Sequence, residues 1–185
     1  MKELSLNILD IAQNSFAVGA PNTSVVLDET DDTLRITVSD DGCGMSPETL
    51  KKVSDPFFTT RTTRKVGLGI PLFRLAAEQT GGYVNIKSSR SGKDRGTVTE
   101  GLFYKKHIDF TPLGDIVSTV CSMMQGCGEN NLLFVHRING KEVRLDSREL
   151  RSVLGDIPLS VPEVQQWIRG YLEQQYDEIK KNNNI

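Results

Sequence analysis

The sequence has few cysteines and little excess charge of either sign. Its three cysteines, Cys43, Cys121 and Cys127, are an odd number and none forms a CxxC pair, so they fit neither a disulfide framework nor a structural zinc site. Lys and Arg total 22 against 24 Asp and Glu, which leaves no basic excess to follow a phosphate backbone. We therefore expect reduced thiols and no nucleic-acid partner.

The chain also lacks a long hydrophobic run. No apolar stretch approaches the roughly 20 residues that a membrane helix needs, and residues 1–7 lack the apolar core of a signal peptide. We therefore expect a cytoplasmic protein with no membrane partner. The length of 185 residues predicts one domain of ordinary size, or one domain with a smaller appendage.

Hydrophobic periodicity predicts both helices and strands over the first hundred residues. Apolar residues at helical spacing indicate helices, and strict alternation indicates half-buried strands. A Ser followed by Pro is typical of a helix start. The expected elements are a buried helix from about 4 to 17, strands at 24–27 and 33–38, a short helix capped by Ser46, a functional loop at 54–66, a helix opening at 67–69, and strands at 83–88 and 97–104.

The residue pattern of the sequence changes near residue 106, after which proline and glycine interrupt the chain. We place a boundary there between domains 1–105 and 106–185. The second part predicts a small α/β appendage of unknown function, and its Asn139-Gly140 pair is typical of a type I′ hairpin turn. The apolar stripe of its last helix favours a partner-docking face over a cofactor site. The expected elements are a helix within 113–124, a hairpin of 132–138 and 141–145, a short helix capped by Ser147, and a helix at 162–180 whose stripe is Val164, Trp167, Ile168 and Tyr171.

Asp10 and Asn14 lie four residues apart on the first expected helix and therefore point from one face. Both are polar on an otherwise apolar segment, and a buried polar pair needs partners. Hydrogen bonds to loop backbone are one interpretation, and a bound cation or water is the other. An Asn carbonyl with phosphate oxygens and waters is a ligand set that suits Mg²⁺.

Two glycine-containing segments are candidates for a ligand site. The segment 40–44 (Asp-Asp-Gly-Cys-Gly) follows a strand, so a carboxylate there can accept a hydrogen bond from an exocyclic amine while the glycines admit a flat ligand. The segment 67–69 (Gly-Leu-Gly) opens a helix whose backbone N–H groups favour a phosphate. Taken alone, the first segment is also typical of an ordinary surface turn.

These motifs occur in the order found in the ATP-binding domain of the histidine-kinase-like ATPases, which roughly residues 1–104 resemble. That superfamily includes DNA gyrase B, Hsp90, sensor histidine kinases and MutL. The resemblance implies an α+β fold, the Bergerat two-layer α/β sandwich with helices on one face of a mixed, mainly antiparallel sheet, plus the small C-terminal α/β segment. The matching segments are the Asn-bearing helix at 10–17, the DxGxG box at 40–44, the Phe-containing lid box at 55–59, the GxG box at 67–69 and the Gly-Thr pair at 96–97.

The resemblance also implies how ATP and Mg²⁺ bind. Asp40 accepts a hydrogen bond from the adenine amine, Gly42 and Gly44 shape the adenine pocket, and Thr97 adds a polar contact near the base. Asn14 holds Mg²⁺ against the phosphates, which the glycines of the GxG box admit to the third helix. The implied ATP-binding residues are Asn14, Asp40, Gly42, Gly44, Met45, Phe57, Thr59, Gly67, Leu68, Gly69 and Thr97.

Asp10 occupies the position at which ATP-hydrolysing members and serine kinases carry a Glu that orients or deprotonates the nucleophile. Here the chain departs from the pattern, because Asp keeps the charge but is one methylene shorter. Asp10 is our candidate catalytic residue. We hypothesise that Arg61, Arg64 or Lys65 meets the γ-phosphate when the lid closes, with a solvated loop as the alternative.

The remaining question is which kind of member this sequence encodes. Because the chain starts inside the first motif helix, we expect no preceding segment with a phosphoacceptor His, and we interpret His107 and His136 as ordinary structural or surface residues. One hypothesis is a small cytoplasmic protein kinase or signalling ATPase that acts on an unidentified protein. The alternative is a non-catalytic ATP-responsive regulatory module, an anti-sigma-like partner switch. A homodimer formed through the C-terminal segment is a further option.

Overall fold

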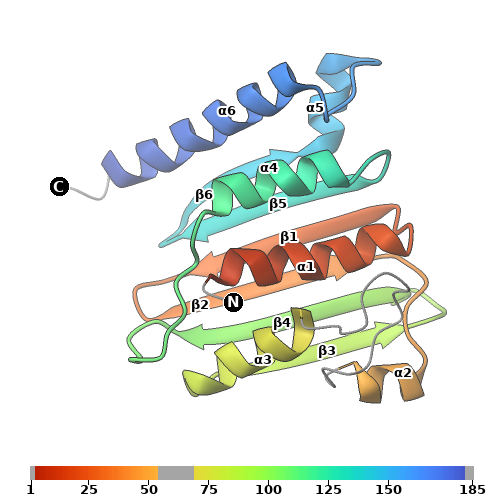
Figure 1. Ribbon diagram of the computed structural model, residues 1–185, viewed down its shortest axis with the longest axis vertical. Coiled ribbons are helices and arrows are strands. Elements are labelled where there is room, and N and C mark those ends of the chain that lie inside the picture. The colour runs from red at the N-terminus through yellow and green to blue at the C-terminus, as the bar shows by residue number, and fades with distance from the viewer. Residues whose placement is uncertain (1–2, 54–68, 182–185) are drawn as a thin grey trace.

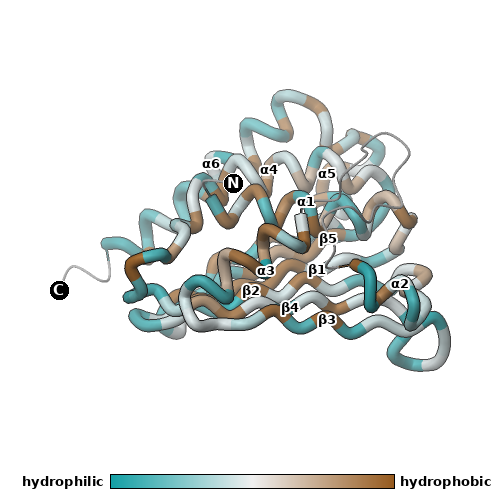
Figure 2. Tube along the Cα trace, turned by 60° about the horizontal axis from the view of Figure 1, so that its bottom comes forward, coloured by the Kyte–Doolittle hydropathy of each residue, from teal (hydrophilic) through white to brown (hydrophobic). Residues whose placement is uncertain are grey.

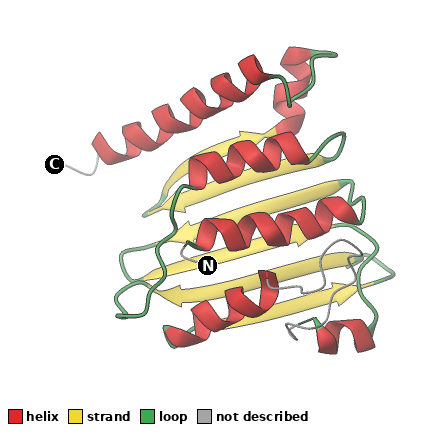
Figure 3. Cartoon of the chain, viewed as in Figure 1, coloured by secondary structure: helices red, strands yellow, loops and turns green. Residues whose placement is uncertain are grey.

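One mixed sheet spans the molecule, as seen in the computed structural model, which describes residues 3–53 and 69–181. The strand order is β3-β4-β2-β1-β5-β6. Every pair is antiparallel except β1 with β5, which is parallel (Figure 3). The strands are β1 (Asn22–Glu29), β2 (Thr33–Asp40), β3 (Tyr83–Ser89), β4 (Gly96–Tyr104), β5 (Asn131–Ile138) and β6 (Lys141–Asp146).

The helices α1, α3 and α4 lie side by side on one face of this sheet, and α6 extends the layer beyond β6 (Figure 1). The structure therefore confirms the expected α+β fold with helices on one face of a mixed, mainly antiparallel sheet. No helix within the described residues is both long and apolar enough to cross a membrane. The helices are α1 (Leu4–Ala17), α2 (Pro47–Lys52), α3 (Gly69–Gln79), α4 (Ile116–Gly126), α5 (Ser147–Leu154) and α6 (Pro162–Lys181).

The core lies between the helical layer and the sheet, where the apolar segments of both layers face each other (Figure 2). Helix α1 buries Leu4, Ile8 and Ile11 at helical spacing, and β2 buries Leu34 and Ile36 at alternate positions. Fully burying each such side chain contributes about 1.5–3 kcal/mol. This face therefore fixes the position of α1, the helix that carries the candidate polar residues.

The C-terminal segment continues the same sheet. Strand β5 pairs in parallel with β1 along its whole length, from the pair Asn22–Asn131 to the pair Glu29–Ile138. Phe134 from this segment belongs to the same cluster of buried residues as Ile8 from α1. The division into two domains at residue 105 stays a prediction. Among residues 3–53 and 69–181, both segments contribute strands to the same sheet and side chains to the same apolar core.

The expected C-terminal elements are present, with two corrections. Asn139 and Gly140 have φ values of 48° and 83°, as the predicted type I′ turn requires. The expected capping role of Ser147 is wrong: Asp146 caps α5 by accepting from the Arg148 N–H at 2.9 Å, because the Ser147 hydroxyl is buried and accepts from the Leu132 N–H.

The expected apolar stripe of α6 is divided between two faces. Val164 and Ile168 are buried, and the buried face continues through Leu172 instead of through the aromatic residues. Trp167 is 55% exposed and Tyr171 is 39% exposed. Their rings stack with centroids 5.1 Å apart at an angle of 9°.

Candidate functional site

Asp40 lies at the end of β2, and its carboxylate is held on both oxygens. The Ser15 hydroxyl on α1 donates to Oδ2 at 2.7 Å, and the Gly42 N–H donates to Oδ1 at 2.9 Å. The bond from Ser15 joins the carboxylate to α1, and the bond from Gly42 stabilises the turn that follows β2. An ionised carboxylate accepts more hydrogen bonds than these two, so Asp40 retains acceptor capacity for a ligand amine.

The glycines of this turn are required by close approach of the backbone. Gly44 has a φ of +64°, and a Cβ there would lie 1.9 Å from the Ser89 carbonyl oxygen. Gly96, across from the turn, has a φ of +123° and would place a Cβ 1.9 Å from the Asp40 carbonyl oxygen. Any other residue is excluded at both positions by contact and by conformation. The two glycines thus let the turn after β2 lie directly against the hairpin of β3 and β4.

Ser88 connects three parts of this hairpin and turn. Its hydroxyl accepts from the Met45 N–H at 2.8 Å and lies 2.9 Å from the Gly96 carbonyl oxygen and 2.8 Å from the Thr97 hydroxyl. Thr97 is also the register partner of Asp40 between β4 and β2. The structure therefore brings Asp40, Thr97 and Met45 together, as their proposed common role in adenine binding would require.

Asp10 is half-buried on α1 beside the start of α3, whereas Asn14, one turn further along α1, is exposed, so the expected buried polar pair is only partly buried. Gly69, the first residue of α3, approaches so closely that a Cβ there would lie 3.0 Å from the Asp10 Cβ. The buried Asn7 side chain donates to the Gly69 carbonyl oxygen at 3.4 Å. Asp10 and Asn7 thus lie beside the first residue of α3, and the N-terminal end of a helix favours an anionic ligand.

The oxygen donors on this face of α1 fit a magnesium ion held mainly by a ligand's phosphates. Within residues 3–53 and 69–181 no group of three or more His, Cys, Asp or Glu side chains is placed to hold a metal ion. Mg²⁺ needs few protein ligands and keeps several waters. The amide oxygen of Asn14 is a donor of the preferred chemical type.

The other half of the expected site lies outside the described residues. It includes the lid segment and the first two residues of the GxG box. These residues are Phe57, Thr59, Arg61, Arg64, Lys65, Gly67 and Leu68.

Sequence reasoning missed four polar residues of the site. The sequence places Ser15 only within the expected buried helix at 4–17, yet its hydroxyl donates to Asp40. Ser88 accepts a hydrogen bond from Met45 in the turn, and Asn7 donates to Gly69 at the start of α3. Thr23 lies in register with Asp40, and its buried hydroxyl has no hydrogen-bond partner among the described residues. Ser15, Asn7 and Thr23 could have been found from the sequence, because each is a hydrogen-bonding residue at a position where the helix or strand pattern expects an apolar one.

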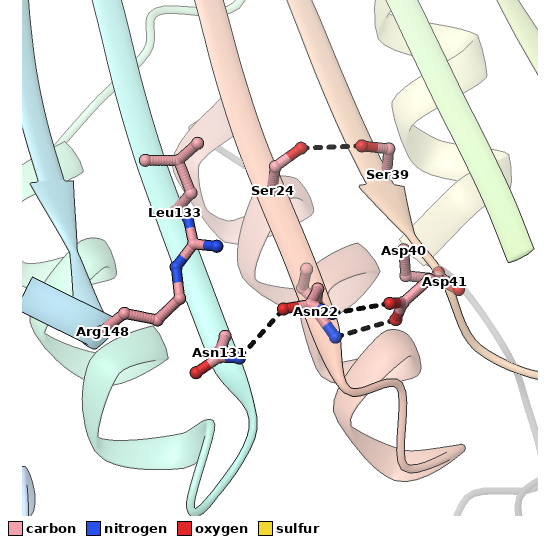
Figure 4. Close-up of a pocket in the computed structure, with 9 residues that line it drawn as sticks. Asn22, Ser24, Ser39, Asp40, Asp41, Asn131, Leu133 and Arg148 are labelled. Atoms are coloured by element: carbon pink, nitrogen blue, oxygen red, sulfur yellow. Dashed lines mark hydrogen bonds between the residues drawn. The ribbon is translucent and has the colours of Figure 1, made fainter. Parts of the chain in front are cut away.

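A cavity of about 310 Å³ lies behind the turn, on the face of the sheet opposite α1 (Figure 4). It shares Asp40 and Asp41 with the turn and is otherwise lined by polar residues of β1, β2 and β5, by Leu133 and by Arg148. Burial would raise the pKa of Asp41, but two hydrogen bonds from Asn22, a bond from its own backbone and the charge of Arg95 together lower the pKa below its ordinary value. Asp41 is therefore a firmly ionised neighbour of Asp40.

The chain is similar to a known family and to several known proteins. A family model described as histidine kinase-, DNA gyrase B-, and HSP90-like ATPase matches residues 1–106. The chain is similar to the sensor protein kinase FleS of Pseudomonas aeruginosa, 41% identical over 58 residues that make up 30% of this chain and 14% of FleS. It is also similar to the sensor histidine kinase ZraS of Salmonella typhimurium, 39% identical over 57 residues that make up 31% of this chain and 12% of ZraS. The match thus covers a small part of each kinase.

A solved structure shares the fold over a longer range. The N-terminal domain of a DNA repair protein superposes with a TM-score of 0.55 at 11% identity, covering 84% of this chain and 58% of that one. At this identity the likeness concerns the fold alone. Its coverage exceeds residues 1–106 and therefore extends into the C-terminal segment.

Proposed function

Because the chain belongs to the histidine kinase-, DNA gyrase B- and HSP90-like ATPases, we propose that it binds Mg-ATP at the site built around Asp40 and acts as a small protein kinase or signalling ATPase. The observation that carries the proposal is the Asp40 carboxylate. Ser15 and Gly42 hold it at the end of β2, and the close glycine turn leaves it acceptor capacity. ATP binding is supported by the family, and the role of each residue is our proposal.

The adenine end of the ligand is recognised by Asp40 and Thr97. The adenine amine donates to the Asp40 carboxylate, and the Thr97 hydroxyl, aligned by Ser88, contacts the base edge. Gly42, Gly44 and Met45 form the turn that flanks the ring. Thr23 offers a further hydroxyl in register with Asp40.

The phosphate end lies between α1 and the start of α3. Asn14 holds Mg²⁺ against the phosphates, and the ion neutralises phosphate charge. Gly69 keeps this position free of a side chain, next to Asp10. We propose that Asp10 orients or deprotonates the group that attacks the γ-phosphate. Gly67, Leu68, Phe57 and Thr59 complete the proposed contacts from outside the described residues.

The substitution Asp40→Asn tests the adenine assignment. The amide side chain offers either its amine group or a weaker acceptor where the ionised carboxylate stood, so we expect ATP affinity to fall about 10- to 100-fold, as for loss of a charge-assisted hydrogen bond. Isothermal titration calorimetry with Mg²⁺ measures the change. Asp28→Asn, on β1 and paired with Arg137, is the control and should bind like the wild type. Unchanged affinity in Asp40→Asn would refute the assignment.

The regulatory alternative has one specific feature in its favour, the Asp at position 10. Incubating the purified protein with labelled ATP and a lysate of the source organism separates an enzyme from a binding module. A kinase labels a protein, an ATPase releases phosphate, and a binding module does neither. Asp10→Asn should abolish either turnover while ATP still binds, because the proposed role of Asp10 is in the reaction and not in nucleotide binding.

The identity of the protein partner and the cellular compartment are also proposals. We propose a cytoplasmic protein with a separate protein substrate or partner, bound through the C-terminal segment, and without nucleic-acid or membrane partners. The exposed, stacked Trp167 and Tyr171 support a docking role for α6, since Trp and Tyr are enriched in protein interfaces. A pull-down from the source organism, with Trp167→Ala as the comparison, would identify the partner.

A further inference from the structure

A chain of side-chain hydrogen bonds joins the turn after β2 to helix α5. The Asn22 amide group donates to Asp41 Oδ2 at 2.7 Å, and the Asn131 amide group donates to Asn22 Oδ1 at 2.9 Å. Arg151 Nη1 donates to Asn131 Oδ1 at 3.1 Å. Figure 4 shows the links from Asn131 through Asn22 to Asp41. We call these four residues the amide relay.

The direction of the amide relay is fixed by the charges at its ends. Arg151 can only donate and the Asp41 carboxylate can only accept. Each Asn must therefore present its oxygen toward Arg151 and its amine group toward Asp41, as both do. Reversing either amide would place two acceptors or two donors face to face. The relay thus has one satisfied arrangement.

Both ends of the amide relay are anchored to backbone. At the turn, Asp41 also accepts from the Asn22 backbone N–H at 2.8 Å, and it directly follows Asp40. At the other end, Arg151 donates to the carbonyl oxygens of Gly128 and Asn130, in the loop between α4 and β5. A displacement of α5 or of this loop would therefore strain the turn that holds Asp40.

We infer that the amide relay makes Asn131 and Arg151 positioning residues for the nucleotide site, so that the C-terminal segment sets part of the affinity for ATP. This inference rests on the proposed function, and it deepens it by assigning a regulatory role to residues outside the family match. Binding of a partner that moves α5 would then change ATP affinity, and ATP would change partner affinity by the same factor.

Asn131→Asp tests the inference while keeping the contact with α5. An Asp at this position still accepts from Arg151 but has no donor for Asn22, so the relay is cut at one link. We expect the dissociation constant for Mg-ATP to rise about three- to tenfold, as for the loss of one hydrogen bond. Asn130→Asp is the matched control, because it adds the same charge one residue away and its side chain is not part of the amide relay. We expect a change of less than about twofold there.

A double substitution separates positioning from a merely structural role. Arg151→Met should weaken ATP binding in the wild-type background but add nothing to Asn131→Asp, since the link it acts through is already cut. A structural role would lower the thermal midpoint without this non-additivity in ATP affinity. If Asn131→Asp does not fold, Arg151→Met is titrated alone against the wild type.

The outcomes distinguish the two proposals. A folded Asn131→Asp or Arg151→Met variant with wild-type ATP affinity overturns the amide relay and leaves ATP binding intact. Absence of ATP uptake by the wild type overturns the proposed function, and the inference falls with it. Reduced affinity in Asn130→Asp equal to that in Asn131→Asp attributes the effect to charge and also overturns the inference.

Discussion

Cys43 differs from the other two cysteines at the residue scale because it lies exposed in the turn that flanks the proposed adenine pocket. Cys121 and Cys127 are buried on the helical side of the molecule, and burial raises the pKa of both thiols. The thiolate is the reactive form. Exposure therefore favours reaction at Cys43, and burial with a raised pKa disfavours it at Cys121 and Cys127.

We expect Ellman's reagent to modify one thiol of the native protein quickly, and Cys43→Ser to remove this fast reaction. ATP with Mg²⁺ should slow it severalfold, because a bound adenine would cover the turn. The absorbance of the released thionitrobenzoate measures both. A fast reaction that Cys43→Ser leaves in place would contradict the prediction, and a rate unaffected by saturating ATP would place the ligand away from the turn.

The sequence predicted local features of the site better than its long-range contacts. The polar pair at 10 and 14, the turn at 40–44 and the pair at 96–97 are readable because spacing and glycines show what each segment does locally. The Ser15–Asp40 bond joins residues 25 positions apart, and the Asn22–Asn131 bond joins residues 109 positions apart. Such partners follow from strand order, which the sequence pattern does not determine.

At the element scale, α6 has one buried apolar face and one face that exposes aromatic side chains. Ile168 is fully buried, whereas its neighbour Trp167 is 55% exposed and stacks only on Tyr171 among the described aromatic rings. The pattern of apolar residues put both on one stripe, because Trp167 and Ile168 are adjacent in sequence and both are apolar. The direction of packing against α4 and β6 decides which one is buried.

Substitutions at these neighbours should therefore separate stability from docking. Ile168→Ala should lower the free energy of unfolding by about 2–5 kcal/mol, as expected for a cavity in a core. Trp167→Ala should lower it by less than about 1 kcal/mol, because little buried surface is lost. Urea denaturation followed by circular dichroism measures both, since Trp167 is the only tryptophan and its removal abolishes a fluorescence signal. Equal losses would contradict the division of faces.

At the scale of the whole molecule, polar side chains form hydrogen bonds at both ends of the junction at which β1 and β5 pair in parallel. The amide relay lies at the end where the strands begin. At the other end Glu29 lies 2.9 Å from His136 Nε2 and accepts from Lys105 Nζ at 2.6 Å. The other imidazole nitrogen lies 2.9 Å from the Tyr176 hydroxyl of α6. Glu29 thereby joins β1, β5, α6 and the residue that follows β4.

The Glu29 cluster predicts a specific loss of stability in acid. Burial works to raise the pKa of Glu29, but the hydrogen bonds and charges of His136 and Lys105 outweigh it and lower the pKa below its ordinary value. A lowered pKa means that the stabilisation is complete above the pKa of an unfolded glutamate and is lost as the pH falls through the folded value. Tyr176, whose pKa is raised by burial, stays neutral throughout this range.

Glu29→Gln isolates this contribution. At neutral pH we expect it to lower the free energy of unfolding by about 1–3 kcal/mol, because Gln offers one neutral acceptor oxygen where Glu29 offers two charged ones to His136 and Lys105. We also expect it to flatten the fall in stability between about pH 5 and pH 3. Glu142→Gln on β6 is the same change at an exposed residue, paired with Arg137 of β5, and should leave the acid limb unchanged. Urea midpoints measured across this pH range provide the comparison. An acid limb as steep in Glu29→Gln as in the wild type would assign the acid sensitivity to other carboxylates.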